Sequence, residues 1–317
     1  MNRLHHSAQE SLLVSFASAY LYGPVIYVEA IGEPALLFET HTANDRRFVT
    51  APRSCTILDT FINHDAQPSS CTIFIGSAGS FNYGHWLVDD LPRLKAVHAL
   101  RARFPTLKIR VLLSLLGDVI DGIRRECTQQ YLSNIDNYSI EFLDCKIPYK
   151  ISNLFYASPV SLHPATKLPA AIAWVAEQAA TFRGDAPQDR LRSDRIFVTR
   201  RPPDSRILLN HEEIAEFLIR HGFIVVDVNG LSFSQQLDLF RDADVIVGCM
   251  GAAMTNTILC ASPVTVVMLV PEGWVEPFYW DLAAVRGDRY AACYGEPDNK
   301  DIAAKCLTRI ASATPRA

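Results

Sequence analysis

His85 and Asp89 stand four residues apart, and their types and spacing suit acid–base chemistry. They belong to a segment that reads Gly-Ser-Phe-Asn-Tyr-Gly-His-Trp-Leu-Val-Asp-Asp over residues 79–90. On a helix, residues four apart lie on one face about one turn apart. Such a pair can work as a carboxylate that orients an imidazole, or as separate acid–base and binding groups. Two ligands do not make a metal site, and no matching cluster of Cys, His or acidic residues lies near them.

The same segment also has a purely structural interpretation. His85 would then cap or hydrogen-bond the preceding loop, while Trp86 and Leu87 fill the core. The residues alone do not decide between this interpretation and the acid–base one.

A second candidate site lies at residues 243–256, where an apolar, β-branched run ends in Gly248 and Gly251. Small residues that suit the first turn of a helix follow these glycines. A helix N-terminus after a strand presents unpaired backbone N–H groups, and the helix dipole attracts phosphate to them. Glycines at strand–helix turns also serve plain close packing, so this motif is weak by itself.

An arginine cluster lies between the two segments. We interpret its first members as part of a solvated linker and helix face: Arg183, Arg190 and Arg192. Three others follow an expected strand, where they are better placed to meet an anion: Arg200, Arg201 and Arg206. Pairing with Glu212 or Glu213 is the alternative for Arg206.

The composition is that of a globular protein, because 49% of the 317 residues are hydrophobic and 20% are charged. A formal net charge of −4 argues against nucleic acid as the main ligand. The 8 cysteines contain no Cys-x-x-Cys and no zinc spacing, so we expect them to be reduced, as in the cytosol. No signal peptide and no apolar run of about 20 residues is visible, which predicts a cytoplasmic protein that can still rest against a membrane.

Local patterns predict an α/β protein with two domains, at residues 1–165 and 166–317. Short strands and loops are expected before residue 70, and strands and helices alternate after it. The expected strands are 71–75, 109–113, 140–143, 154–156, 195–199, 223–226, 244–247 and 264–270. The expected helices are 83–103 with an interruption near Pro92, 117–131, 169–182, 210–221 and 232–241. Strands separated by single helices indicate a doubly wound parallel sheet in the second half.

Two of these helices carry matching N-terminal patterns. Asn210 is followed three residues on by Glu213, and Ser232 by Gln235. Both pairs predict a capping box, in which the two side chains satisfy backbone N–H groups of the first turn.

In the order and spacing of two blocks, the chain resembles glycosyltransferase family 61, which includes plant xylosyltransferases, animal O-linked N-acetylglucosaminyltransferases and bacterial capsule proteins. The first block is Asn82-x-x-His85-Trp86-Leu87-x-Asp89-x-Leu91-Pro92-Arg93-Leu94. The second runs from Phe197-Val-Thr-Arg200-Arg201 through Arg206-x-x-x-Asn210 and Leu231-Ser232-Phe233 to Gly248-x-x-Gly251-Ala252-x-x-Thr255-Asn256. The resemblance lies within residues 79–290, about two thirds of the chain.

The resemblance implies a GT-B-like architecture, in which two Rossmann-type domains face a cleft. It also implies an inverting transfer without metal or cofactor, from a nucleotide sugar, with a UDP-sugar expected, to a glycan or glycolipid acceptor in bacterial surface polysaccharide assembly. The C-terminal domain would hold the donor through Arg200, Arg201, Arg206, Gly248, Met250, Gly251, Ala252 and Asn256. From the N-terminal domain, Asp89 is the expected base and His85 the runner-up. Asn82 and Trp86 would shape the acceptor side, although core packing is an equal alternative for Trp86.

Three departures from the family pattern concern the donor pocket. Met250 stands where His is usual, Met268 where Glu is usual, and Gln235 where Glu is frequent. Methionine cannot donate a hydrogen bond to a diphosphate and accepts one only weakly. These replacements predict either an unusual donor or a catalytically degenerate member that acts as a binding or scaffold protein. A dinucleotide-dependent oxidoreductase is disfavoured, because no Gly-x-Gly-x-x-Gly turn follows an early strand.

Overall fold

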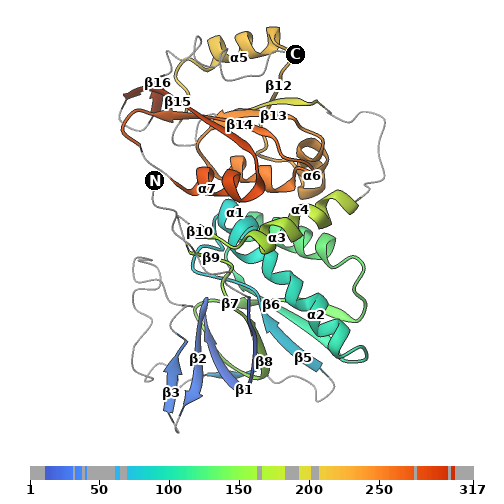
Figure 1. Cartoon of the computed structure of the whole chain (residues 1–317). Helices are drawn as coiled ribbons and strands as arrows, with labels where there is room; N and C mark the ends of the chain where they lie inside the picture. Colours follow the sequence, from blue (N-terminus) through green and yellow to red (C-terminus); the bar gives the residue numbers. More distant parts are fainter. Residues whose placement is uncertain are drawn as a thin grey trace, which may run out of the picture. The chain divides into compact units, whose positions relative to one another are not determined.

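The chain folds into two compact units, Met1–Val160 (unit 1) and Ser161–Ala317 (unit 2) (Figure 1). The structure is a computed structural model that describes residues 11–30, 33–37, 40, 61–64, 70–162, 166–182, 193–200, 207–274, 277–298 and 301–303. Both units are α/β, as the sequence predicts.

Unit 1 is built on a mixed sheet of the order β3-β2-β1-β8-β5-β6-β7, with β4 paired to β8. Its strands are β1 (Leu13–Tyr22), β2 (Val25–Ala30), β3 (Glu33–Leu36), β4 (Ile62–Asn63), β5 (Ser70–Phe74), β6 (Lys108–Leu115), β7 (Tyr138–Asp144) and β8 (Pro148–Ala157). The strands β8, β5, β6 and β7 run parallel to one another. The pairs β1–β2, β2–β3 and β1–β8 are antiparallel. The expectation of a Rossmann-type domain therefore holds only for the parallel half of unit 1.

The antiparallel half follows from a tight connection. Gly23 and Pro24 alone join β1 to β2, and Gly23 has a φ of 57° that favours glycine. Two residues can join only antiparallel strands, because a parallel pair needs a crossover of a dozen or more. The helices of unit 1 supply such crossovers, with α2 (Lys95–Arg103) between β5 and β6 and α3 (Asp118–Tyr131) between β6 and β7.

A helical run precedes α2 and changes its pitch twice. It begins with α1 (Tyr83–His85), widens to a π-helix, η3 (Trp86–Asp90), and tightens to a 3₁₀ helix, η4 (Leu91–Leu94). Proline has no backbone N–H and clashes with the carbonyl four residues before it. The expected interruption near Pro92 is thus confirmed, and it takes the form of a change in pitch.

Unit 2 contains a six-stranded sheet of the order β12-β11-β13-β14-β15-β16. Its strands are β11 (Arg195–Val198), β12 (Ile224–Val226), β13 (Val245–Cys249), β14 (Thr265–Pro271), β15 (Arg289–Asp298) and β16 (Asp301–Ala303). All neighbours are parallel except β15 and β16. The five parallel strands have the doubly wound order 2-1-3-4-5 in chain sequence, which confirms the parallel sheet expected for this half.

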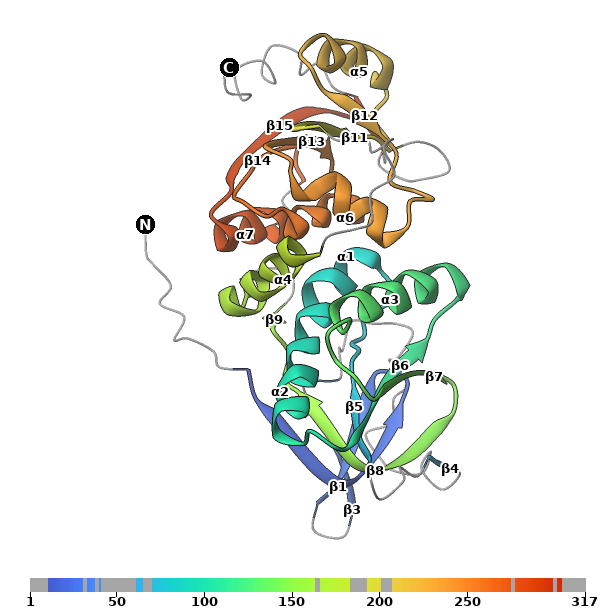
Figure 2. The same ribbon diagram turned by 90° about the vertical axis from the view of Figure 1, so that its right-hand side faces the viewer.

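Helices cover both faces of this sheet (Figure 2). On one face, α5 (His211–Arg220) packs through Ile214 and Leu218 onto Phe197, Val247 and Val267. The other face carries α6 (Phe233–Arg241), the 3₁₀ helix η5 (Ala252–Leu259) and α7 (Pro277–Arg286), with α4 (Pro169–Thr181) packed against them. A short hairpin, β9 (Ser161–Leu162) and β10 (Thr166–Lys167), precedes α4. Neither α7 nor β15 was expected from the sequence.

The two expected capping boxes have different outcomes. Ser232 accepts a hydrogen bond from Gln235 N, and the Gln235 side chain accepts one from Ser232 N, so this box is confirmed. Asn210 occupies the N-cap position of α5, but the expected capping box does not form, because its side chain caps no backbone group and instead donates to Glu213 Oε2 at 3.1 Å. Its backbone, at φ −97° and ψ 39°, is not in the extended conformation typical of a cap residue.

Within the described ranges, six cysteines are unpaired: Cys71, Cys127, Cys145, Cys249, Cys260 and Cys293. No helix in that part of the chain is both long enough and apolar enough to cross a membrane.

Candidate active site

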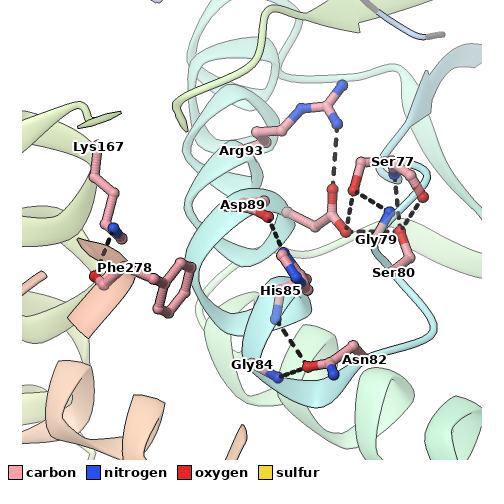
Figure 3. A network of polar contacts seen from close by, with 11 residues as sticks. Ser77, Gly79, Ser80, Asn82, Gly84, His85, Asp89, Arg93, Lys167 and Phe278 are labelled. Atoms are coloured by element: carbon pink, nitrogen blue, oxygen red, sulfur yellow. Dashed lines mark hydrogen bonds and ion pairs between the residues drawn. The ribbon is translucent and has the colours of Figure 1, made fainter. Parts of the chain in front are cut away.

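The His85–Asp89 pair forms a direct contact in unit 1. His85 ends α1, Asp89 lies in η3, and His85 Nδ1 is 2.7 Å from Asp89 Oδ2 (Figure 3). The side chains keep 25% and 13% of their surfaces exposed, respectively. The expectation that the two share one helix face is therefore confirmed. A carboxylate at Nδ1 holds the imidazole in the tautomer whose lone pair is on Nε2.

Asn82 fixes the start of the helix that carries His85. Its Oδ1 accepts hydrogen bonds from the backbone N–H groups of Gly84, at 2.9 Å, and His85, at 3.4 Å. Its extended backbone is that of a helix N-cap, and such caps stabilise helices by about 1 kcal/mol. The structure thus gives Asn82 a part in orienting His85.

Gly79 lies against the imidazole ring. A Cβ at this position would be 3.0 Å from both Cβ and Cγ of His85, which is closer than ordinary van der Waals contact. The absence of a side chain at residue 79 therefore lets the loop support the ring.

A buried charged network holds the same loop from the other side. Asp90 is fully buried, and its Oδ2 accepts hydrogen bonds from Ser80 Oγ at 2.7 Å and Ser77 Oγ at 3.2 Å. Arg93 approaches Asp90 Oδ1 at 3.4 Å and donates to the carbonyls of Gly76 and Ala157. Burial raises the pKa of the Asp90 carboxyl, and the nearby Arg93 opposes that rise. Asp90 thus anchors the loop over residues 76–80.

Trp86 lies in the core of unit 1. Its side chain is fully buried, and the guanidinium of Arg124, on α3, lies over its ring at 4.8 Å from the centroid. Of the two alternatives for Trp86, the structure therefore favours core packing over stacking on an acceptor sugar. Sequence reasoning missed Arg124 because this contact joins residues that are far apart in the chain.

In unit 2, Arg200 follows β11 and lies beside the turn that ends β13. Its Nη1 donates to the carbonyl of Met250 at 3.3 Å. A Cβ at Gly251 would collide with the Arg200 guanidinium. Gly251 has an extended backbone, with φ at 170°, so close approach explains the glycine better than backbone conformation does.

Close approach also explains the glycine at position 248. A Cβ there would collide with Met254 Sδ and lie 3.2 Å from the Val198 carbonyl oxygen. Val198 pairs with Gly248 across the parallel strands β11 and β13. The chain leaves β11 toward β12 on one side and returns to β13 on the other, so the strand order reverses between β11 and β13. Ligands of open α/β sheets bind outside the carboxyl ends of strands at such a switch point.

The remaining donor-side candidates are placed differently. Ala252 begins η5, so a helix follows the glycines as expected, and it is a 3₁₀ helix. Asn256 is fully buried, and its amide donates to Gln236 Oε1 at 2.7 Å, which ties η5 to α6. Its side chain therefore does not join Arg200 at the strand ends. Arg201 and Arg206 lie outside the described residues.

The methionines that depart from the family pattern are buried. Met268 is fully buried within β14, opposite Gly248, and Met250 is 3% exposed. With methionine at both positions, the polar groups at this turn are the Arg200 guanidinium and the backbone N–H and C=O groups. In the part of the chain that the structure describes, no three His, Cys, Asp or Glu side chains gather as a metal site would require.

The protein thus has two α/β units. One carries a histidine–aspartate pair, and the other carries a doubly wound sheet with the Arg200 cation at its switch point. The family model described as Glycosyltransferase 61 matches residues 83–268, more than half of the chain, so the chain belongs to this family. It is a glycosyltransferase, with a nucleotide-sugar donor and an acceptor as its substrates. No curated protein matches the chain.

Proposed function

We propose that this glycosyltransferase binds its nucleotide-sugar donor in unit 2, at the switch point between β11 and β13. The observation that carries the proposal is the contact of Arg200 with the Met250–Gly251 turn, where a side chain at residue 251 would displace the guanidinium. Arginine is charged at every relevant pH and suits phosphate oxygens. Hydrogen bonds to charged groups contribute about 1.5–3 kcal/mol each.

The proposed reaction is an inverting single displacement without a metal ion. The acceptor hydroxyl oxygen attacks the anomeric carbon, the bond from that carbon to the diphosphate breaks, and a base takes the hydroxyl proton. Arg200 and backbone N–H groups of the turn would stabilise the departing diphosphate, a task that preorganised cations and donors can perform.

The geometry in unit 1 favours His85 as the base, with Asp89 as the residue that orients it. This order differs from the expectation based on the sequence, in which Asp89 is the base and His85 the runner-up. Because Asp89 Oδ2 contacts Nδ1, the proton of the acceptor would go to Nε2 of the imidazole. The developing imidazolium would then be stabilised by the adjacent carboxylate, which needs no proton itself.

The wider role rests on the family. We propose a GT-B arrangement in which unit 1 takes the acceptor, because a base and a donor carried by different units must meet across a cleft. The proposed donor is a UDP-sugar, and the proposed acceptor is a glycan or glycolipid of bacterial surface polysaccharide assembly. A cytoplasmic location, with peripheral contact to the inner membrane, would suit that role.

A binding and hydrolysis screen with a chelator tests this proposal. The full chain is mixed with EDTA and a panel of UDP-sugars, GDP-sugars and NAD, and both thermal stabilisation and donor hydrolysis are measured. We expect one class of nucleotide sugar to stabilise the protein and to be hydrolysed slowly. Stabilisation by NAD alone would contradict the proposal, and no binding to any donor would favour the catalytically degenerate alternative.

A further inference from the structure

Unit 1 contains a cavity of about 590 Å³ at the carboxyl ends of its parallel strands. Ser77 follows β5, Leu115 ends β6 and Asp144 ends β7, and all three line the cavity. The carboxyl ends of parallel strands are the usual place for ligands in such sheets. The volume lies within the range of about 300–1,000 Å³ that is typical of small-molecule sites.

The wall of this cavity is the loop that supports the candidate base. Ser77, Ala78 and Phe81 line the cavity, while Gly79 of the same loop lies against the His85 ring. Phe81 is two residues from Gly79, so their Cα atoms are at most about 7 Å apart. The hydrogen bonds of Ser77 and Ser80 to Asp90 hold this loop in place (Figure 3). The cavity and the His85–Asp89 pair therefore share this loop, although neither His85 nor Asp89 lines the cavity.

The side chains of the cavity suit a neutral ligand with many hydroxyl groups. Phe81 and Leu115 are 44% and 47% exposed, and they offer apolar surface to the C–H face of a ring. Asp118 and Asp144 offer carboxylates to hydroxyl groups, against the single cation of Lys146. Aromatic surface combined with a few convergent polar groups is typical of a site that orients a small ligand.

A phosphate ligand fits this cavity poorly. Leu116 and Gly117, at the N-terminus of α3, already donate their N–H groups to Asp121 Oδ2, at 2.8 and 2.9 Å. Arg124 in turn contacts Asp121 Oδ1 at 2.8 Å. The helix end therefore already has a carboxylate in the place that an anion would take, and Asp118 and Asp144 add further negative charge.

We infer that this cavity binds a sugar ring of the acceptor, with Phe81 against the ring and Asp144 on its hydroxyl groups. The inference rests on the proposed function and adds to it the place and the chemical class of the acceptor: an uncharged saccharide rather than a phosphorylated group.

Ligand-observed saturation-transfer NMR tests the inference without requiring turnover. The probes are the p-nitrophenyl glycosides of xylose, glucose, galactose and N-acetylglucosamine, each mixed with the full chain. At least one glycoside should receive saturation from the wild-type protein. Phe81→Ala and Asp144→Asn should weaken its binding about tenfold, and Phe81→Tyr should restore it. Val119→Ala is the matched control, because Val119 is 82% exposed and does not line the cavity.

Two results would overturn the inference: no glycoside that binds the wild-type protein, or equal binding by Phe81→Ala, Asp144→Asn and the wild type. Donor hydrolysis is measured separately on the wild-type protein. A glycoside that binds at Phe81 without any donor hydrolysis would support the cavity and contradict the proposed transfer. Donor hydrolysis together with unaltered glycoside binding in both variants would support the proposed transfer and contradict the cavity as the acceptor site.

Discussion

In unit 1, the His85–Asp89 pair rests on side chains that bond to one another, whereas in unit 2 Arg200 lies against a glycine where any side chain would displace it. The buried Asp90 fixes the loop behind His85 through two serines and an arginine. The strand ends of unit 2 instead depend on the absence of side chains at Gly248 and Gly251. This difference fits the proposed division of work between the two units. An acid–base group needs a defined orientation, whereas a diphosphate needs close access to the backbone and to a cation.

The largest expected effect falls on the chemistry in unit 1. His85→Ala should lower kcat by about 10²- to 10⁴-fold, the usual contribution of a positioned general base. Added imidazole should restore part of the activity, because it can occupy the vacated space and accept the proton. Steady-state transfer assays measure both effects, and His221→Ala, on an exposed histidine, is the control. Rescue of Asp89→Ala by acetate, without rescue of His85→Ala by imidazole, would return the role of base to Asp89.

The support behind that pair is tested by Asp90→Ala. Removal of one partner of a buried ion pair leaves Arg93 uncompensated, which costs about 3–5 kcal/mol of unfolding free energy. Asp136→Ala is the matched control, because Asp136 is 86% exposed beside Arg101 and should cost at most about 1 kcal/mol. Urea denaturation followed by circular dichroism measures both values. Equal losses in the two variants would show that the buried network does not hold the loop.

The unit 2 side of the comparison is tested by Arg200→Ala, which should weaken donor binding by about 1.5–3 kcal/mol. Gly251→Ala should cause a similar loss, because its Cβ displaces the same guanidinium. Isothermal titration calorimetry should then show little further loss in the double variant, since both changes remove one interaction. Gly122→Ala is the control, because a Cβ there meets no atom within 4 Å. Additive losses would contradict the shared cause.

The smallest expected effect concerns a second polar network in unit 1 that belongs to neither site. Hydrogen bonds from Arg110, with His64 as a further partner, lower the pKa of Glu141 to about 2. A lowered pKa stabilises the fold above the ordinary pKa of the group, and this stability is lost as the pH falls toward 2.

After a discount for partial exposure, Glu141 should contribute about 1–2 kcal/mol to the stability of the fold near neutral pH. Between about pH 5 and pH 3, Glu141→Gln should therefore lose less stability than the wild type in urea denaturation. Equal losses over that interval would show that Glu141 is not stabilised in this way.

Much of unit 2 could be predicted from the sequence because its signals are local. The parallel strands β11 to β14 are short apolar runs bounded by turn residues, whereas the longer β15, with charged residues at both ends, was not expected. Ser232 with Gln235 forms the expected capping box. Asn210 with Glu213 shows the same pattern, but its backbone is not extended and no box forms. The side-chain types alone therefore do not fix a cap, because the cap also depends on how the preceding loop arrives.

Unit 1 was harder to predict because its partners are distant in sequence. Strand β1 pairs with β8, and Leu13 lies opposite Ala157. No local sequence pattern predicts this long-range pairing. The sequence therefore predicted only short strands and loops before residue 70. In the candidate site, the spacing of His85 and Asp89 predicted their shared helix face. The support from Gly79 and Asp90 depends on the path of the loop, which spacing does not reveal.

The most direct test of the central claim is a map of where the donor binds. Amide hydrogen exchange of the full chain is compared with and without UDP, in the presence of EDTA. We expect slower exchange in the peptides that cover the end of β11 and residues 248–255. Protection confined to unit 1, or no protection without a divalent ion, would contradict metal-independent donor binding at the β11–β13 switch point.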